Sequence, residues 1–152
     1  MKKSLNKQFT LTVNTEIEMK LLEQTDAEEL FQIVQTNREF LSQWLIWVRS
    51  VKSIKDSRKK IQHDQDGFYN GNSLELGIFK NSRLIGRIGF ISISGFEAEI
   101  GYWLSETENG KGTISLCCKK LIEYAFAETG IHRVVIRMDT ENVKSKKIPE
   151  RL

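Results

Sequence analysis

Apolar and polar residues alternate in two short segments near the start of the chain, Phe9–Val13 and Ile17–Leu22. Asn14 and Thr15 separate the two segments. A period of two is typical of strands with one buried face, and polar residues of this kind favour turns. The pattern therefore predicts a β-hairpin.

Three helices are expected after the hairpin, because the apolar spacing changes there from two to three or four residues. Thr25 and Glu28 have the spacing of a capping box, which predicts a helix that starts at Thr25 and ends near Asn37. Ser53 is the expected cap of the third helix. The apolar positions of the three helices are, in order, Leu30, Phe31, Ile33 and Val34; Phe40, Leu41, Trp44, Leu45 and Trp47; and Ile54, Ile61 and Phe68.

The second half of the chain begins with strand signals. Leu74–Lys80 and Arg83–Ser92 flank a turn at Asn81 and Ser82, and Ala98–Leu104 follows a break at Ser94 and Gly95. Connections this short predict antiparallel neighbours. The remaining expected elements are a helix over Thr113–Glu128 stopped by Gly130, a strand over Val134–Met138, a loop over Asp139–Val143 and a helical segment over Ser145–Leu152. This order predicts one α+β domain over residues 1–152, with a mixed, mostly antiparallel sheet and helices on its faces.

Composition excludes several classes of partner. The chain has 152 residues, of which 39% are hydrophobic and 28% charged, with a formal net charge of +3. Its basic residues are scattered rather than clustered, so we expect no direct contact with nucleic acid. No apolar segment approaches the length of a membrane span, and no apolar run follows the N-terminal lysines as in a signal peptide. The expected location is cytoplasmic, with no membrane partner.

Cysteines and histidines give no pattern for a disulfide or a metal. Cys117 and Cys118 are the only cysteines, and as neighbours on a predicted helix they are expected to pack in its core. His63 and His132 lie far apart in the sequence, without the spacing of metal ligands. We expect no metal, an exposed helical position for His63 and a loop position for His132.

The polar loop Asn109-Gly110-Lys111-Gly112-Thr113 carries the clearest chemical signal. The free amides and dipole of a helix N-terminus attract anions, and glycine lets the backbone approach them closely. The loop therefore predicts a pyrophosphate site. A nucleotide P-loop requires Ser or Thr after its lysine, but Gly112 follows Lys111. A dinucleotide fingerprint requires a third glycine or an alanine where Ser115 stands.

The segment AEIGYWLSETENGKGTISLCCKKLIEYAF instead resembles the acetyl-CoA motif of the GNAT N-acetyltransferase superfamily, written [QR]-x-x-G-x-[GA]. It is most similar to the RimJ/RimL type, which acetylates the N-termini of ribosomal proteins. The strands Leu76–Phe79 and Leu84–Phe90 and the segment Glu141–Leu152 also match this group. The resemblance covers the chain from Ile17 onwards and implies the GNAT (acyl-CoA N-acyltransferase) fold. Asn109 departs from the pattern, because the family more often has Gln or Arg there.

The resemblance implies acetyl-CoA as the co-substrate. In the family the strand before the motif ends in a bulge and splays from its neighbour, and the pantetheine arm enters the gap. Backbone groups of Trp103 and Leu104 would pair with that arm, and the glycine loop would wrap the pyrophosphate. Asn142 would reach the pantetheine or the acetyl end. The implied cofactor-binding residues are Trp103, Leu104, Asn109, Gly110, Lys111, Gly112, Thr113 and Asn142.

The implied reaction is the attack of a neutral amine on the thioester, with most of the rate expected from positioning. Glu99 is a candidate general base, and Ser145 is a candidate proton donor to the departing thiolate. Other interpretations stay open. Glu99 could be a solvent-facing strand residue and Ser145 the cap of the last helix. Trp44 and Trp47 could be core residues rather than aromatics around the acceptor groove.

The expected acceptor is a primary amine, with the N-terminal α-amine of a ribosomal protein as the best match. In the family two further strands, beginning with Gly-Phe, follow the position of Leu152. We therefore expect a C-terminally incomplete domain in which Val134–Met138 presents an open apolar edge, which a second copy could cover as a homo-oligomer. A fragment, a natural truncation and completion by another subunit all stay open. The alternative function is a non-catalytic acyl-CoA-binding or interaction protein derived from this fold.

Overall fold

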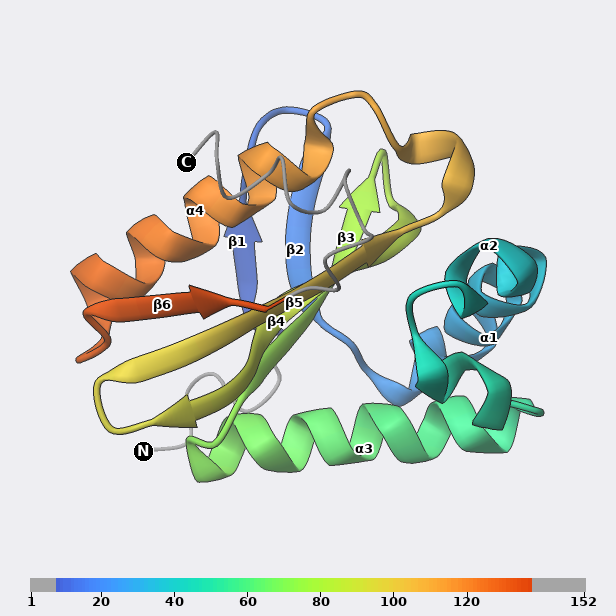
Figure 1. Ribbon diagram of the computed structural model, residues 1–152, viewed down its shortest axis with the longest axis horizontal. Helices are drawn as coiled ribbons and strands as arrows, with labels where there is room; N and C mark the ends of the chain where they lie inside the picture. Colours follow the sequence, from blue (N-terminus) through green and yellow to red (C-terminus); the bar gives the residue numbers. More distant parts are fainter. Residues whose placement is uncertain (1–7, 138–152) are drawn as a thin grey trace.

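In the computed structural model, residues 8–137 are described, and they form a six-stranded sheet with helices on both faces (Figure 1). The strands lie side by side in chain order: β1 (Thr10–Thr12), β2 (Ile17–Leu21), β3 (Leu74–Lys80), β4 (Arg83–Ser94), β5 (Glu97–Leu104) and β6 (Arg133–Ile136). All neighbours run antiparallel except β5 and β6, which run parallel because a helix connects them. The predicted mixed, mostly antiparallel sheet is confirmed.

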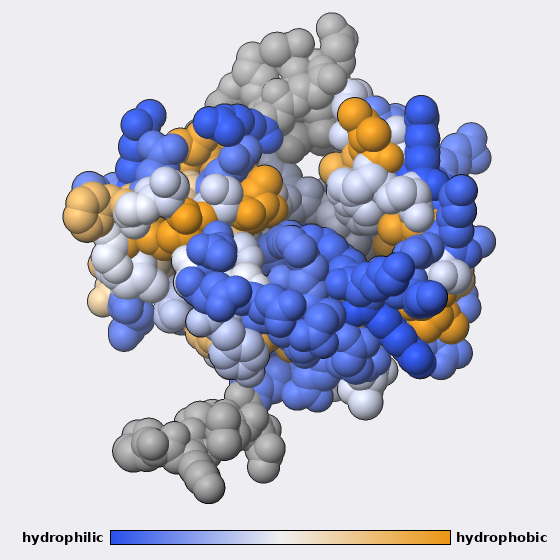
Figure 2. Space-filling model, turned by 90° about the horizontal axis from the view of Figure 1, so that it is seen from below, coloured by the Kyte–Doolittle hydropathy of each residue, from blue (hydrophilic) through white to orange (hydrophobic). Residues whose placement is uncertain are grey.

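The helices are α1 (Ala27–Thr36), α2 (Arg38–Ser42), α3 (Ile54–Asn70) and α4 (Thr113–Glu128), with 3-10 turns at Gln24–Asp26, Ile46–Ser50 and Glu106–Glu108. Helix α3 lies along one face of the sheet and α4 along the other, while α1 and α2 gather at one end (Figure 1). Figure 2 views the molecule from the side of α3, and most of that surface is hydrophilic.

Each face of the sheet buries its own hydrophobic cluster. The larger cluster joins the sheet to α4, and its fully buried side chains include Met19, Leu76, Ile88, Phe90, Ile100 and Leu121. The smaller cluster joins α1 and α3 to the other face and includes Leu22, Val34, Val48 and Ile61. Cys117 and Cys118 are buried in the larger cluster, as expected. Burial raises the pKa of each thiol to about 12, so neither is a nucleophile at neutral pH.

The helix caps follow the sequence in one case and depart from it in another. Ser53 caps α3 through a capping box with Asp56, as predicted. Thr25 was expected to cap the first helix, and this was wrong, because it lies inside a 3-10 turn. The box there is formed by Glu23 and Asp26, and the Glu23 amide donates to Asp26 Oδ2 at 2.8 Å. Glu23 therefore caps the 3-10 turn, and α1 itself begins after Asp26, its N-cap residue.

The second helical run is shorter than its apolar spacing predicts. Helix α2 ends at Ser42, and Ile46–Ser50 forms a 3-10 turn. Leu41 and Val48 are buried, but Trp44 and Trp47 remain 38% and 42% exposed. The interpretation of the two tryptophans as core residues is therefore wrong.

Within the described residues, a bulge lies in β4 at its pairing with β5. The family pattern places one at the end of the strand before the glycine loop, and the chain that follows Arg137 beside that strand lies outside the described residues. Phe90 pairs with Ile100 and Ser92 pairs with Glu99, so Ile91 is the extra residue. From Ile100 to Leu104, β5 pairs with β4 without a further shift in register.

Several predicted elements lie outside the described residues. These are Met138, the loop Asp139–Val143, the segment Ser145–Leu152 and the site residues Asn142 and Ser145. Across residues 8–137, no helix has both the length and the apolar character that crossing a membrane requires.

Candidate active site

The loop between β5 and α4 presents its backbone to open space. Gly110 and Gly112 have φ angles of 81° and 77°, in the left-handed region that favours glycine. No atom lies within 4 Å of the position that a Cβ would take on either residue. Gly112 is also the N-cap of α4, so the first amides of that helix, beginning at Thr113, have no partner within it. This geometry suits an anionic group such as a pyrophosphate.

The polar side chains of this loop have different roles. Asn109 Nδ2 donates to the Ser105 carbonyl at 3.1 Å, so the side chain ties the loop to the end of β5. Lys111 Nζ lies 3.6 Å from Glu108 Oε1 and remains about half exposed. Lys80 lies 3.4 Å from the same Glu108 oxygen, which anchors the loop to β3. Of these side chains, Lys111 is the one placed to meet a phosphate.

Ser115 was not predicted as a site residue. It lies in the first turn of α4, and its Oγ is buried with no hydrogen-bond partner within residues 8–137. Buried hydroxyls in folded proteins normally have a partner, and a phosphate oxygen at this helix N-terminus would supply one. The sequence showed Ser115 only as a mismatch to a dinucleotide fingerprint, and nothing in its spacing marked it as buried.

Strand β5 continues beyond its pairing with β6. The parallel register begins at Glu97 and Arg133 and ends at Ile100 and Ile136. On its other side β5 stays paired with β4 as far as Leu104. Within residues 8–137, Trp103 and Leu104, the residues expected to offer backbone groups to pantetheine, therefore lie past the last residue of β5 that pairs with β6.

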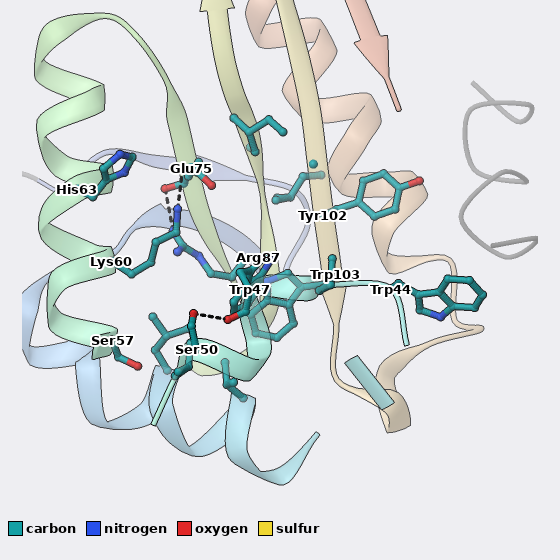
Figure 3. A pocket seen from close by; sticks show the side chains of 18 of the residues that line it. Trp44, Trp47, Ser50, Ser57, Lys60, His63, Glu75, Arg87, Tyr102 and Trp103 are labelled. Carbon is teal, nitrogen blue, oxygen red and sulfur yellow. Dashed lines mark hydrogen bonds and ion pairs between the residues drawn. The ribbon is translucent and has the colours of Figure 1, made fainter. Parts of the chain in front are cut away.

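A cavity of about 890 Å³ opens on the α3 side of the sheet at this point. Figure 3 shows α3 side chains on one wall, strand residues on another and two tryptophans near the edge. Among the residues that line it are Trp44, Trp47, Lys60, Glu75, Arg87, Gly89, Glu99, Gly101 and Trp103. Of the residues predicted from sequence, the structure brings Glu99 and Trp103 together here. The glycine loop and Leu104 do not line the cavity.

Glu99 forms part of the cavity wall. Its side chain is 22% exposed, and its Oε2 accepts a hydrogen bond from Arg137 Nη1 at 3.1 Å. Glu99, Gly101 and Trp103 alternate along β5 and therefore share a face of the sheet. A carboxylate in this position could accept a proton from an amine inside the cavity, either directly or through water.

Trp44, in the turn after α2, and Trp47, in the 3-10 turn, border the cavity instead of filling the core. The ring centroids of Trp47 and Trp103 are 6.1 Å apart, with the planes at 49°. Ser50 Oγ donates to the Trp47 carbonyl at 2.7 Å, which fixes the turn (Figure 3). Half-exposed aromatic rings beside a cavity are typical of a surface that binds a partner.

A network of four charged residues lies at the inner end of the cavity, and none of its members was predicted as a site residue. Lys60, Glu75 and Arg87 line the cavity, whereas Asp64 does not. Asp64 Oδ2 lies 2.7 Å from Arg87 Nη1, and Asp64 Oδ1 lies 2.9 Å from Lys60 Nζ. Lys60 Nζ also donates to Glu75 Oε2 at 3.1 Å. The one signal in the sequence was Arg87, a charge within the apolar strand Leu84–Phe90, because a charge in a core requires a partner. The partners come from α3 and β3.

The two carboxyl groups of this network titrate in opposite directions. Burial acts to raise the pKa of Asp64, but the charges of Arg87 and Lys60 outweigh it and hold that pKa below its ordinary value. Burial, together with the negative charge of Asp64, raises the pKa of Glu75. The side chain of Asp64 is 1% exposed and that of Glu75 is 16% exposed. The network therefore holds one firmly ionised carboxylate and one that binds a proton more readily.

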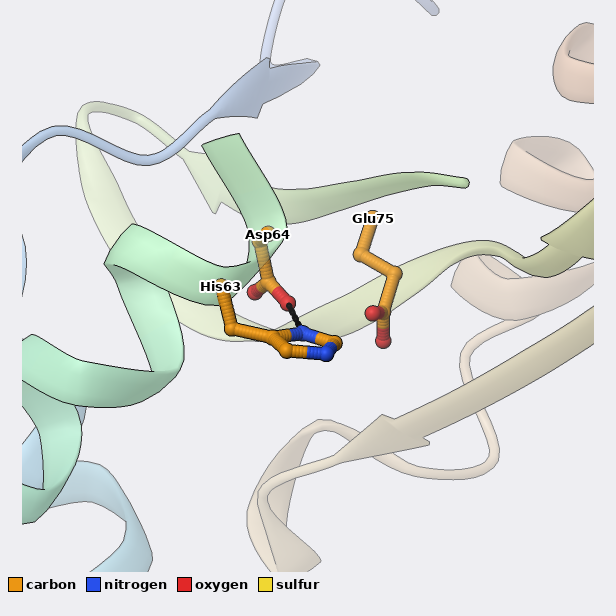
Figure 4. Close-up of side chains that lie close together, drawn as sticks. All are labelled: His63, Asp64 and Glu75. Atoms are coloured by element: carbon orange, nitrogen blue, oxygen red, sulfur yellow. Dashed lines mark ion pairs between the residues drawn. The ribbon is translucent and has the colours of Figure 1, made fainter. Parts of the chain in front are cut away.

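His63, Asp64 and Glu75 place possible metal-ligand atoms within 4.8 Å of one another (Figure 4). The Lys60 ammonium already lies 2.9 Å from Asp64 and 3.1 Å from Glu75. The positive charge that this cluster requires is thus supplied by a side chain. The His63 side chain is 75% exposed, which confirms the exposed helical position expected for it.

Comparison with known proteins agrees with this geometry. A model of the acetyltransferase (GNAT) domain family matches residues 17–152. YdaF of Bacillus subtilis (strain 168) is 37% identical over 147 residues, which span 95% of this chain and 80% of YdaF. The ribosomal-protein-serine acetyltransferase of Escherichia coli (strain K12) is 33% identical over 142 residues, which span 91% of this chain and 79% of that protein.

Solved structures show the same similarity. RimL, a ribosomal L7/L12 α-N-protein acetyltransferase solved with coenzyme A, superposes with a TM-score of 0.91 at 28% identity, covering 94% of this chain and 82% of RimL. The microcin C7 self-immunity acetyltransferase MccE, solved with acetyl-CoA and AMP, has a TM-score of 0.88 at 31% identity, covering 91% of this chain and 78% of MccE. The chain belongs to the acetyltransferase (GNAT) domain family.

Proposed function

We propose that this protein transfers the acetyl group of acetyl-CoA to the N-terminal α-amine of a polypeptide, with a ribosomal protein as the acceptor. The observation that carries the proposal is the position of the cavity. It lies against the part of β5 that follows the last β5–β6 pair within residues 8–137, and it is lined by both Glu99 and Trp103. A cofactor arm along this part of β5 would meet an acceptor in the cavity.

The cofactor half of the site is formed by the loop and the end of β5. The amides from Gly110 to Thr113 would hold the pyrophosphate, with the Lys111 ammonium and the Ser115 hydroxyl as further donors. Trp103 and Leu104 would align the pantetheine arm by backbone pairing. Acetyl-CoA supplies an acetyl group already activated as a thioester, so these residues have only to position it.

In the acceptor half, Glu99 takes a proton from the α-ammonium, directly or through a water molecule. The neutral amine attacks the carbonyl carbon and a C–N bond forms. The nitrogen then loses its second proton, and the C–S bond breaks to release the amide and the thiolate, so that the proton lost by nitrogen balances the one that the thiolate takes up. That thiolate takes up a proton to leave as CoA. Ser145 is our candidate for the donor of this proton, and Asn142 for a contact with the acetyl end of the cofactor.

Two observations support a polypeptide N-terminus as the acceptor. Trp44 and Trp47 are partly exposed beside the cavity, which suits a polypeptide segment better than a small, fully enclosed amine. Two similar proteins also carry this activity in their names. RimL is an α-N-protein acetyltransferase of L7/L12, and its Salmonella typhimurium relative modifies the N-terminal serine of that protein.

The test combines cofactor binding with turnover. Titration with acetyl-CoA should raise the melting temperature, because a ligand that binds only the folded state stabilises it. Release of free thiol should then depend on a peptide with an unblocked N-terminus, and the same peptide with a blocked N-terminus should give none. Binding without release from any amine would contradict the proposal and favour a non-catalytic CoA-binding protein. Absence of binding would refute both.

A further inference from the structure

One apolar side chain, that of Ile91, enters the cavity from the bulge in β4. Ser92 pairs with Glu99 on β5, and Ile91, the residue before it, is the extra residue of the bulge. A bulge changes the direction in which its extra side chain points, and bulges are frequent beside active sites. Ile91 is 46% exposed and lines the cavity. It therefore offers an apolar contact to a ligand bound there.

The Ile91 side chain lies over Gly101 of β5. Its Cγ2, Cδ1 and Cγ1 atoms are 3.0, 3.6 and 4.0 Å from the position that a Cβ on Gly101 would take. Among residues 8–137, and leaving aside the two residues that flank Gly101 in the chain, no other atom comes closer. A glycine inside a strand often marks such a close approach. The missing side chain of Gly101 thus makes room for that of Ile91.

The glycines of β4 have a different role. A Cβ on Gly86 would lie 2.2 Å from the Trp103 carbonyl oxygen, and one on Gly89 would lie 2.1 Å from the Leu74 carbonyl oxygen. Both glycines are therefore required by the backbone of the sheet, which no change of side chain can relieve. Gly101 differs from them, because what it accommodates is a single side chain on the cavity face.

The contact places Ile91 close to the candidate base. Glu99 and Gly101 are two residues apart on one face of β5, so their Cα atoms lie about 7 Å apart. An amine that gives its proton directly to Glu99 lies about 3 Å from the carboxylate. Apolar groups are in contact at about 4 Å. An acceptor in this position therefore has its α-carbon and first side chain within reach of Ile91.

We propose that Ile91 is a specificity-determining residue that contacts the first side chain of the acceptor, and that Gly101 fixes its position. This inference rests on the proposed function. Adding or removing one methylene in an apolar pocket changes the discrimination between two substrates by about 10- to 200-fold. The volume of the Ile91 side chain therefore sets how much room the first acceptor residue has beside Glu99.

Ile91 and Gly101 should behave as a coupled pair. Ile91→Ala removes Cγ1, Cγ2 and Cδ1, the three atoms that lie over Gly101, and opens space beside Glu99. Gly101→Ala adds a methyl group 3.0 Å from Ile91 Cγ2, so Ile91 has to move away from β5 and further into the cavity. In the double variant the new methyl group meets none of these three atoms and fills part of the space that they leave.

The test compares two peptides that differ only in their first residue, which is alanine or leucine. Ile91→Ala should raise the leucine-to-alanine ratio of kcat/KM by about tenfold or more. Gly101→Ala should lower this ratio, and the double variant should lie between Ile91→Ala and wild type. Phe126→Ala is the control, because Phe126 is 53% exposed but belongs to α4 and does not line the cavity. It should leave the ratio unchanged.

Affinity for CoA separates a contact with the acceptor from a contact with the cofactor. Calorimetric titration should give the same dissociation constant for wild type and Ile91→Ala, and a weaker affinity in the variant would overturn the inference by assigning Ile91 to the cofactor arm. An unchanged leucine-to-alanine ratio in Ile91→Ala would also overturn it, while leaving the proposed function intact. The ratio is independent of how much of each variant is folded. If wild-type protein acetylates no free-amine peptide, the proposed function itself fails.

Discussion

Arg87 Nη1 on β4 lies 2.7 Å from Asp64 Oδ2 on α3, and this pair joins the helix to the sheet behind the cavity wall. The two side chains are 8% and 1% exposed. Removing one partner leaves a buried, unpaired charge, so Arg87→Met should reduce the free energy of unfolding by about 3–5 kcal/mol. Urea denaturation monitored by circular dichroism measures this loss.

The same experiment has two controls. The double variant Asp64→Leu with Arg87→Met should recover much of the stability, because no unpaired charge remains. Arg133 and Glu97 form a comparable pair at 3.0 Å, but their side chains are 73% and 41% exposed. Arg133→Met should therefore cost less than about 1 kcal/mol. A loss at Arg87 no larger than that at Arg133 would show that the buried pair does not support the fold.

Glu75 should give the stability a specific pH dependence. Its pKa is raised from an ordinary value of 4.5, by burial first and by Asp64 second. The folded state therefore binds this proton more tightly than the unfolded state does. The resulting stabilisation is complete below pH 4.5 and is lost as the pH rises through the raised value.

Glu75→Gln cannot lose this proton, so its stability relative to wild type should increase as the pH rises above 4.5. Urea unfolding of both proteins at a series of pH values measures the difference. The pKa of Asp64 is lowered, so its contribution to stability is lost only as the pH falls below the ordinary value of 3.8. The pH ranges in which Asp64 and Glu75 change the stability therefore do not overlap. A difference that stays constant or shrinks above pH 4.5 would contradict the raised pKa.

The glycine loop can be tested with a pair of matched substitutions. Gly112 has φ 77° and Gly95, in the turn between β4 and β5, has φ 60°. Neither has an atom within 4 Å of its potential Cβ. Alanine should cost about 1–2 kcal/mol of stability at either position because of the left-handed backbone. Only Gly112→Ala should also weaken CoA binding, which calorimetric titration measures. Equal CoA affinity in the two variants would show that the pyrophosphate binds elsewhere.

Glu99 and Glu97 offer a second matched pair. Glu99 forms an ion pair at 3.1 Å with Arg137, which follows β6. Glu97 forms one at 3.0 Å with Arg133, which lies in β6. Only Glu99 lines the cavity. Glu99→Gln should lower kcat at neutral pH by about a hundredfold or more, as for loss of a general base. Glu97→Gln should leave it nearly unchanged, and CoA affinity should be unaffected in both. Equal rates in the two variants would assign the base to another group.

The order of the elements could be predicted from the sequence because each one carries a local signal. The alternation in Ile17–Leu22, the cap at Ser53 and the glycine-spaced loop before Thr113 each identify an element without reference to its neighbours. The predicted cap of the first helix was wrong because two local caps with the same spacing compete. Thr25 has the correct spacing for a cap, but Glu23 and Asp26 form the box instead.

The acceptor half of the site was less predictable, because it is formed by residues that are distant in sequence. Lys60, Asp64, Glu75 and Arg87 meet only after α3 packs on the sheet, and no short motif links them. Helical spacing left open whether Trp44 and Trp47 lie in a core or beside the acceptor groove. The helix ends at Ser42, and the turn that follows directs them to the cavity edge. The register of β3, β4 and β5 aligns Glu75 with Gly89 and Gly101, and this alignment likewise exists only in the folded sheet.

The central claim is that the protein acetylates an N-terminal α-amine with acetyl-CoA. Its most direct test is mass spectrometry of a peptide that contains both a free N-terminus and an internal lysine, after incubation with the protein and acetyl-CoA. We expect a single added acetyl group, located on the α-amine. Acetylation of the lysine side chain alone, or an unmodified peptide in the presence of bound cofactor, would contradict it.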